Sequence, residues 1–212
     1  MKLPAGYIFI LTALFLSSCA NPAENKTKAI TQESSSTLTA KQTKGTTIKF
    51  SEANSKINFV GSKVTGKESG EFKTFSGTID LVGNKPEESQ VSVDIDMASV
   101  TTDAGGLADH LKTADFFEVE KYPKATFIST KIASDKEKGE NNYSVTGDLN
   151  FHGVKKSITF PAKIVVTDNE VTVDSEFFIN RREFNVNYAG RANDLIRDEV
   201  VLTLNIKAPR QK

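Results

Sequence analysis

From residue 46 onward, apolar and polar residues alternate along the chain. Val91, Val93 and Ile95, for example, are separated by Ser92 and Asp94. Strict alternation places one face of a segment against a core and the other in water, which is typical of antiparallel strands. The same pattern predicts strands around residues 48–50, 57–59, 79–81, 91–97, 143–151, 158–166, 171–179 and 202–206.

Residues that favour turns separate several of these strands. They occur at 83–86, 138–142, 152–153 and 167–169. Residues 103–117 break the alternation, because Leu107, His110 and Leu111 have helical spacing. We therefore predict an all-β fold, an antiparallel barrel of about eight strands, with one short helical insertion near residues 103–117; a sandwich is the alternative.

The N-terminus has a different pattern. Lys2 precedes an apolar run at residues 7–16, and Leu-Ser-Ser at 16–18 leads into Cys19. A ten-residue helix spans about 15 Å, roughly half of a bilayer core, so the run is short for a transmembrane helix. The pattern predicts a signal peptide at residues 1–18.

Leu-Ser-Ser-Cys resembles the lipobox of bacterial lipoproteins, which implies that Cys19 is lipidated and anchors the chain to a membrane. Cys19 is the only cysteine, so a disulfide cannot use it within one chain. The alternative is an ordinary cleaved signal with an incidental cysteine. Ala20, rather than aspartate, follows Cys19. The resemblance then favours the outer membrane facing the periplasm over the inner membrane or the cell surface.

Residues 19–44 are rich in Ser, Thr, Lys and Gln and contain no aromatic residue. Such a segment buries too little apolar surface to offset its ordering entropy. We predict a lipidated N-terminus and flexible polar tether at 19–44, followed by the barrel domain at 45–209. A short amphipathic segment around 29–37 is the alternative.

Composition narrows the possible functions. The chain has 27 basic and 27 acidic residues, so no net charge favours nucleic acid. Phe9 and Phe15 lie in the predicted signal, which leaves 12 of the 14 phenylalanines to the rest of the chain. This supply of large apolar side chains indicates one domain stabilised by its own core, without disulfides.

Residues 109–127, DHLKTADFFEVEKYPKATF, closely resemble the signature of the YceI-like family. The similarity continues at 145–154, 180–184 and 198–202 and covers 46–208 in all. It implies a secreted protein with a lipocalin-like barrel that binds polyisoprenoids or related amphiphiles. Two positions depart from the family: residues 61–66 lack the histidine that many members carry, and Asn185 replaces a usual glycine. Asparagine tolerates a left-handed backbone, so we expect the turn to persist.

A polyprenyl chain needs a continuous apolar tunnel, and an eight-stranded barrel is just wide enough for one slim ligand. We predict a lipid-binding cavity lined by residues that alternate along the strands: Phe59, Ile79, Val93, Ile95, Phe127, Leu149, Phe151, Phe160, Phe177 and Ile179. The alternative is that these side chains fill the interior. The protein would then be a structural or interaction module of the cell envelope.

His110 and Arg181 are candidates for contacting a ligand head group, since arginine pairs well with pyrophosphate. The alternatives are structural: His110 hydrogen-bonded beside Phe116 and Phe117, which close one barrel end, and Arg181 in an ion pair with Glu183 or Asp198. His110 and His152 lack metal-ligand spacing, and the chain has no Gly-x-Ser-x-Gly motif. We therefore expect a non-enzymatic protein with no metal or cofactor. An enzyme acting on an isoprenoid-linked substrate is the least favoured alternative, and the oligomeric state is not predicted.

Overall fold

The computed structural model describes residues 21–34 and 45–210. Its strands are β1 (Ile30–Glu33), β2 (Thr46–Ser51), β3 (Lys56–Lys63), β4 (Gly66–Phe72), β5 (Phe75–Val82), β6 (Lys85–Asp96), β7 (Val100–Thr102), β8 (Lys124–Ser134), β9 (Asn142–Phe151), β10 (Val154–Val166), β11 (Glu170–Asn180), β12 (Gly190–Arg191), β13 (Asp194–Leu195) and β14 (Glu199–Pro209). The helical elements are α1 (Leu107–Lys112) and the 3-10 turns η1 (Met97–Ser99), η2 (Lys136–Lys138) and η3 (Arg181–Phe184).

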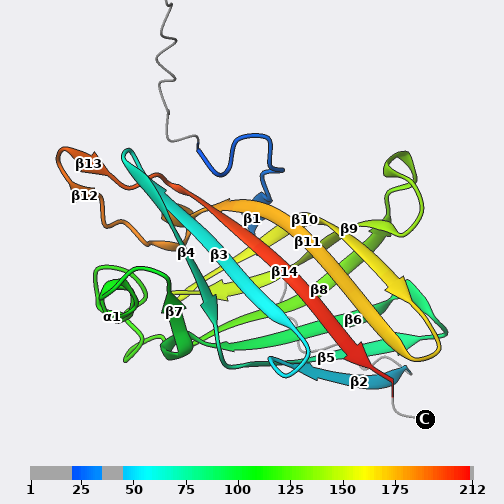
Figure 1. Ribbon diagram of the computed structural model, residues 1–212. Coiled ribbons are helices and arrows are strands. Elements are labelled where there is room, and N and C mark those ends of the chain that lie inside the picture. The colour runs from blue at the N-terminus through cyan, green and yellow to red at the C-terminus, as the bar shows by residue number, and fades with distance from the viewer. Residues whose placement is uncertain (1–20, 35–44, 211–212) are drawn as a thin grey trace, which may run out of the picture.

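A twelve-stranded antiparallel sheet forms the wall of the molecule, in the order β2-β5-β6-β8-β9-β10-β11-β14-β3-β4-β7, with β1 paired to β10. The sheet curls until β2 lies against β14 (Figure 1). The predicted all-β antiparallel fold is confirmed. The strand count is larger than expected, partly because β4 reads GKESGEF and has almost no apolar alternation to reveal it.

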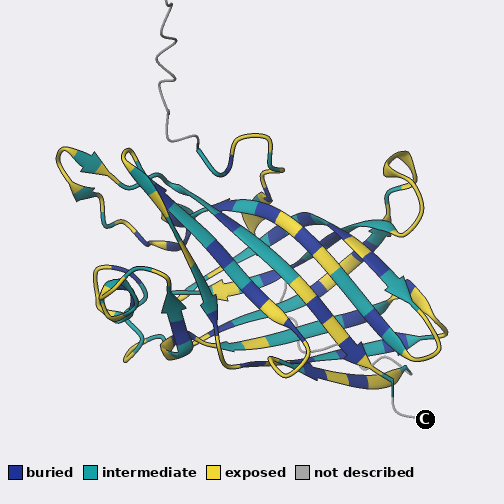
Figure 2. Cartoon of the chain, in the orientation of Figure 1, coloured by how far each residue is buried: buried dark blue, intermediate teal, exposed yellow. Residues whose placement is uncertain are grey.

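Alternating burial builds the core. In β5, Phe75, Gly77, Ile79 and Leu81 are buried, while Ser76, Thr78 and Asp80 between them are more exposed. Figure 2 shows the same exchange of buried and exposed positions along β10, β11 and β14. One face of each strand therefore lines the interior, as the period of two predicts.

The four predicted turns join neighbouring strands, as expected. Gly83 and Asn84 between β5 and β6, and His152 and Gly153 between β9 and β10, all have positive φ angles. Two consecutive positive φ values suit the two-residue turns of twisted hairpins. Gly153 also permits a close approach, because a Cβ there would lie 2.5 Å from the ring of Tyr122.

The predicted helical insertion is confirmed as the short helix α1. It lies at one end of the barrel, the end that also carries the β12–β13 hairpin, and the β10–β11 turn lies at the other end (Figure 1). Of the helices in the part of the chain that the structure describes, none is long and apolar enough to cross a bilayer.

The segment before the barrel differs from the prediction of a flexible tether over 19–44. Ile30–Glu33 forms β1 and pairs with residues 156–159 of β10. Ala29 is only 1% exposed and belongs to the core. Backbone hydrogen bonds to the wall, rather than apolar side chains, hold this segment, so its polar composition did not predict a strand. The predicted signal peptide at 1–18, Cys19 and residues 35–44 lie outside the described residues.

Candidate functional site

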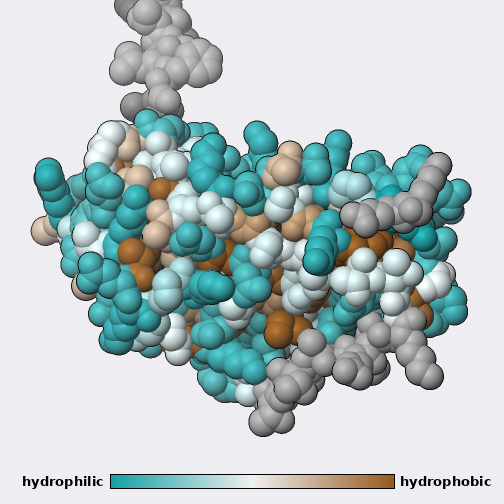
Figure 3. Space-filling view, turned by 90° about the horizontal axis from the view of Figure 1, so that it is seen from below, coloured by the Kyte–Doolittle hydropathy of each residue, from teal (hydrophilic) through white to brown (hydrophobic). Residues whose placement is uncertain are grey.

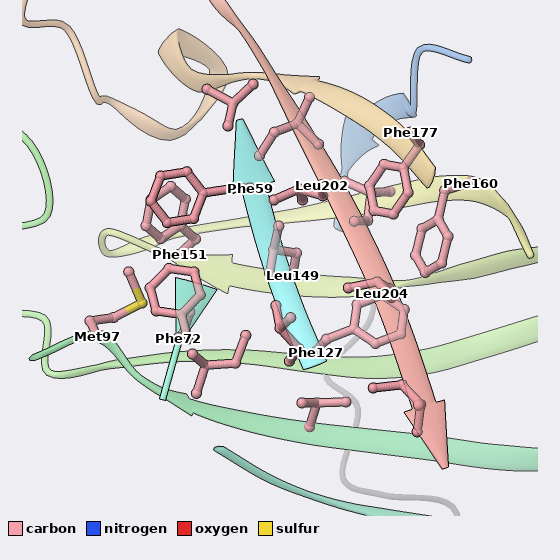
Figure 4. Close-up of a pocket in the computed structure, with 18 of the residues that line it drawn as sticks. Phe59, Phe72, Met97, Phe127, Leu149, Phe151, Phe160, Phe177, Leu202 and Leu204 are labelled. Atoms are coloured by element: carbon pink, nitrogen blue, oxygen red, sulfur yellow. The ribbon is translucent and has the colours of Figure 1, made fainter. Parts of the chain in front are cut away.

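An apolar cavity of about 250 Å³ lies inside the barrel. Residues from most wall strands line it, and Leu111 of α1 and Phe116 and Phe117 just after it face it from one end. Figure 4 shows Phe59, Leu149 and Leu204 pointing into the same space from β3, β9 and β14. The lining side chains, apart from the stem of Arg181, are all hydrocarbon or thioether groups. The molecule therefore holds an apolar cavity. Figure 3 shows that one outer face of the wall is mostly hydrophilic, with some hydrophobic residues visible between the polar ones.

All ten residues predicted to line a cavity do line it. Whether they contact a ligand stays a prediction. Sequence reasoning left out several others, among them Phe50, Ile57 and Phe72. Phe50 and Ile57 follow the same alternation and could have been found from it.

Aromatic rings make up much of the cavity wall. Phe160 of β10 stacks on Phe177 of β11, with ring centroids 4.3 Å apart and planes at 11°. Phe117 meets Phe151 edge to face at 5.7 Å. Ring pairs of this kind contribute about 0.5–1.5 kcal/mol each beyond the burial of their area. Contacts between aromatic rings therefore help to shape the cavity.

Glycines on neighbouring strands explain why the inward-pointing phenylalanines do not meet on the barrel axis. A Cβ on Gly77 would lie 2.1 Å from Cζ of Phe50, and one on Gly70 would lie 2.2 Å from Cζ of Phe59. Each ring thus lies flat over a glycine of the next strand, against the wall. This arrangement leaves the centre open and contradicts the alternative of a filled interior.

The cavity has additional open space next to Gly61. It lines the cavity two residues beyond Phe59 on β3, where the alternation points inward. A Cβ built on Gly61 would meet nothing within 4 Å. The cavity therefore has room at Gly61 that a larger residue would fill.

His110 lies on the outer side of the residues that close one barrel end. Its Nε2 is 2.8 Å from Oδ2 of Asp115, and its ring packs edge-on against Phe116 and Tyr188. Phe116 lines the cavity, whereas the His110 side chain is 40% exposed. This placement favours the structural interpretation of His110, and contact with a head group stays untested.

Arg181 is buried at the start of η3, and its guanidinium is occupied by protein oxygens. It donates to the carbonyls of Val186 at 2.6 Å, Arg197 at 3.0 Å and Ile196 at 3.3 Å. Asp198 Oδ1 lies 3.4 Å away. Burial lowers the pKa of Arg181, the charge of Asp198 opposes that shift, and neighbouring Arg182 adds to it.

These contacts make Arg181 the anchor of the segment at 186–198, which carries the β12–β13 hairpin. The ion pair with Asp198 matches the structural alternative, and a head group would have to compete with three backbone carbonyls for the same donors. Among residues 21–34 and 45–210, no cluster of three His, Cys, Asp or Glu side chains could hold a metal ion.

Comparison with known proteins assigns this barrel and cavity to a family. The pattern of the YceI-like domain matches residues 48–208, nearly the whole barrel. The chain belongs to the YceI-like family. The crystal structure of BcnA from Burkholderia cenocepacia is similar, with 29% sequence identity and a TM-score of 0.66 over 75% of this chain and 99% of that one.

Two other proteins extend the comparison. A UPF0312 protein of Pseudomonas putida (strain GB-1) is 44% identical over 93 residues, 44% of this chain and 47% of its own length, so the chain spans about half the length of such curated relatives. A polyisoprenoid binding domain from Saccharophagus degradans has a TM-score of 0.61 at 20% identity, over 78% of this chain and 98% of that domain. At that identity the likeness shows the fold alone.

Asn185 keeps the expected turn. Its φ of 60° and ψ of 16° are left-handed, and its N–H donates to the carbonyl of Arg182 at 3.1 Å. The prediction that asparagine preserves this turn is confirmed. Arg181 is therefore held at the start of this turn.

Proposed function

We propose that the protein binds a long, slim apolar lipid, an isoprenoid or a similar amphiphile, inside the barrel. The hydrocarbon-lined cavity carries this proposal. Each CH2 group that leaves water for such a surface contributes about 0.8 kcal/mol, so a few isoprene units supply substantial binding energy. The neighbour from Saccharophagus degradans shares the fold and is described as polyisoprenoid binding, which supplies the ligand class to test.

The lining of the cavity is suited to binding a ligand without reacting with it. Its side chains are hydrocarbons, a thioether and the stem of Arg181. Such a surface recognises shape and hydrophobicity, and the polar end of an amphiphile would lie toward a barrel end. The cavity weighs against the alternative of a structural module with a filled interior.

Extraction of the purified protein tests this function. The full chain carrying Cys19→Ser, which removes the proposed anchor, is purified without detergent and extracted with organic solvent. We expect mass spectrometry to find close to one equivalent of an apolar lipid per chain. Recovery of only trace lipid, together with no uptake of added geranylgeraniol, would contradict the proposal.

We further propose that Cys19 is lipidated and holds the barrel at a membrane of the cell envelope, the periplasmic face of the outer membrane being favoured. The Leu-Ser-Ser-Cys sequence at 16–19 supports this anchor. Two or three long acyl chains hold a protein at a membrane almost permanently, because each buried CH2 adds to the affinity.

Radiolabelled palmitate tests the anchor. We expect cells that express the full chain to label it, and the label to partition with membranes. Cys19→Ser should abolish both, since no other cysteine is present. A Cys19→Ser chain that still labels and sediments with membranes would rule out Cys19 as the anchor.

A further inference from the structure

The barrel wall has a seam between β10 and β11. β11 pairs with β14 along its whole length, but it pairs with β10 only at residues 163–166. Residues 154–162 of β10 pair with β9 on one side and have no β11 partner on the other. The two strands therefore part over most of their length.

Pro161 explains where the seam begins. The carbonyl of Pro161 accepts a hydrogen bond from Oγ of Ser175 on β11, at 2.5 Å, so this residue faces β11. In a strand the N–H of a residue points to the same side as its carbonyl, and proline has no N–H to donate. The ladder between β10 and β11 cannot continue through this position.

The chain's own N-terminal segment fills the seam. Ala29 N–H donates to the carbonyl of Phe178 at 2.8 Å, and Phe178 N–H donates to the carbonyl of Thr27 at 3.0 Å. The next residues, Ile30–Glu33, pair with β10. Figure 1 shows this segment, drawn in blue, beside β10 and β11.

The N-terminal segment has fewer buried contacts than the other strands of the wall. Of residues 27–33 only Ala29 is buried, and Ile30 is 61% exposed. Three ion pairs hold the segment, Lys26 with Glu176, Lys28 with Glu183 and Lys156 with Glu33. Each has at least one exposed partner, and such pairs contribute little. Few buried contacts and short pairing are typical of elements that open locally.

The cavity lies directly behind this segment. Ile158 and Phe160 of β10 and Phe177 and Ile179 of β11 flank the seam and line the cavity. The stacked rings of Phe160 and Phe177 bridge the two strands from inside, and Figure 4 shows them together near β1, drawn in pale blue. Other routes lead through barrel ends, one of which is closed by Phe116 and Phe117.

We propose that β1 is a displaceable strap over a side port between β10 and β11, through which the apolar ligand enters and leaves the cavity. This rests on the proposed function. Thr27 comes eight positions after Cys19, so a lipidated Cys19 would keep the port within about 28 Å of the membrane surface. An apolar chain could then pass between bilayer and cavity without crossing much water.

A disulfide that locks the strap tests the port. Gln32 and Ser157 are register partners whose side chains face outward, so Gln32→Cys with Ser157→Cys joins β1 to β10. The full chain also carries Cys19→Ser, which leaves these two thiols alone. We expect the oxidised form to take up hexadecylpyrene from phosphatidylcholine vesicles at least about tenfold more slowly than the reduced form, with unchanged equilibrium binding.

Thr172→Cys with Lys207→Cys is the matched control, since it joins outward-facing partners on β11 and β14 away from the seam. Oxidation of this pair should leave the uptake rate unchanged. Equal rates for the locked and reduced strap would overturn the port while leaving the binding function intact.

Hydrogen exchange provides a readout that needs no ligand. We expect amides of residues 29–33 that bond to the wall to exchange at least about a hundredfold faster than those of β9, because the strap opens locally. Protection equal to that of β9 would overturn the strap even if no form of the protein took up hexadecylpyrene, an outcome that would count separately against the proposed function.

Discussion

Gly61→Leu is expected to lower the affinity for an apolar ligand at least about tenfold without lowering the stability of the fold. Gly61 lines the cavity, and a Cβ there meets nothing within 4 Å. A leucine side chain would displace two or more CH2 groups of a ligand, each contributing about 0.8 kcal/mol. The same side chain gains apolar burial, and replacing glycine within a strand restricts the unfolded chain, so urea unfolding should shift to equal or higher concentration.

Gly66→Leu is the matched control. Gly66 begins β4 outside the cavity lining, and an added Cβ there would only approach Cε of Lys63 at 3.9 Å. We expect this variant to bind hexadecylpyrene, followed by fluorescence titration, like the parent chain. If Gly61→Leu binds as tightly as Gly66→Leu, the ligand does not occupy this part of the hollow.

The alternation of apolar and polar residues was enough to predict eight strands of the sheet, their inward faces and part of the cavity lining, but not β8, which was not among the predicted segments. The alternation is informative because successive side chains of a strand point to opposite faces of the sheet, so a sheet with one apolar face and one solvated face shows a period of two. β4 escaped because its face is mostly polar, at residues such as Lys67 and Glu68. β1 was not predicted because backbone hydrogen bonds to its partner strand hold it in place, and such bonds do not depend on the type of side chain in β1.

Whether the interior is hollow or filled could not be predicted from alternation, because both give the same pattern. The close approach of Phe50 to Gly77, and of Phe59 to Gly70, decides it. Each pair joins neighbouring strands in register, so the sequence holds the signal only once the pairing is known. Pro161 lies within a predicted strand and has no N–H to donate, so the sequence did indicate that pairing along one edge of this strand is interrupted.

The role of Arg181 was equally out of reach of local patterns. Its guanidinium donates to the carbonyls of Val186, Ile196 and Arg197. The sequence of the segment that carries these carbonyls shows no alternation, so it gave no sign that they would meet Arg181. Sequence reasoning could name Asp198 as an ion-pair partner, but it could not show that the donors were already used.

Arg181→Met is expected to destabilise the protein by about 3–5 kcal/mol, a drop in Tm of roughly 10 °C for a domain of this size. Methionine keeps the apolar stem along the cavity but leaves three carbonyls at the barrel end without their donor. The segment at 186–198 should loosen first, because its link to η3 runs through this side chain. Urea unfolding and thermal melts measure the loss.

Arg182→Met is the control that distinguishes the anchoring role of Arg181 from the mere loss of a positive charge next to Asp198. Arg182 also bonds Asp198, with Nε 2.6 Å from Oδ1, but its side chain is 49% exposed. An exposed ion pair of this kind is worth at most about 1 kcal/mol, so its loss should barely move the melt. If both variants melt alike near the parent temperature, the buried guanidinium does not anchor the barrel end. Arg181 would then be free to serve a ligand head group, and weaker binding of an isoprenoid pyrophosphate by Arg181→Met would be the expected sign.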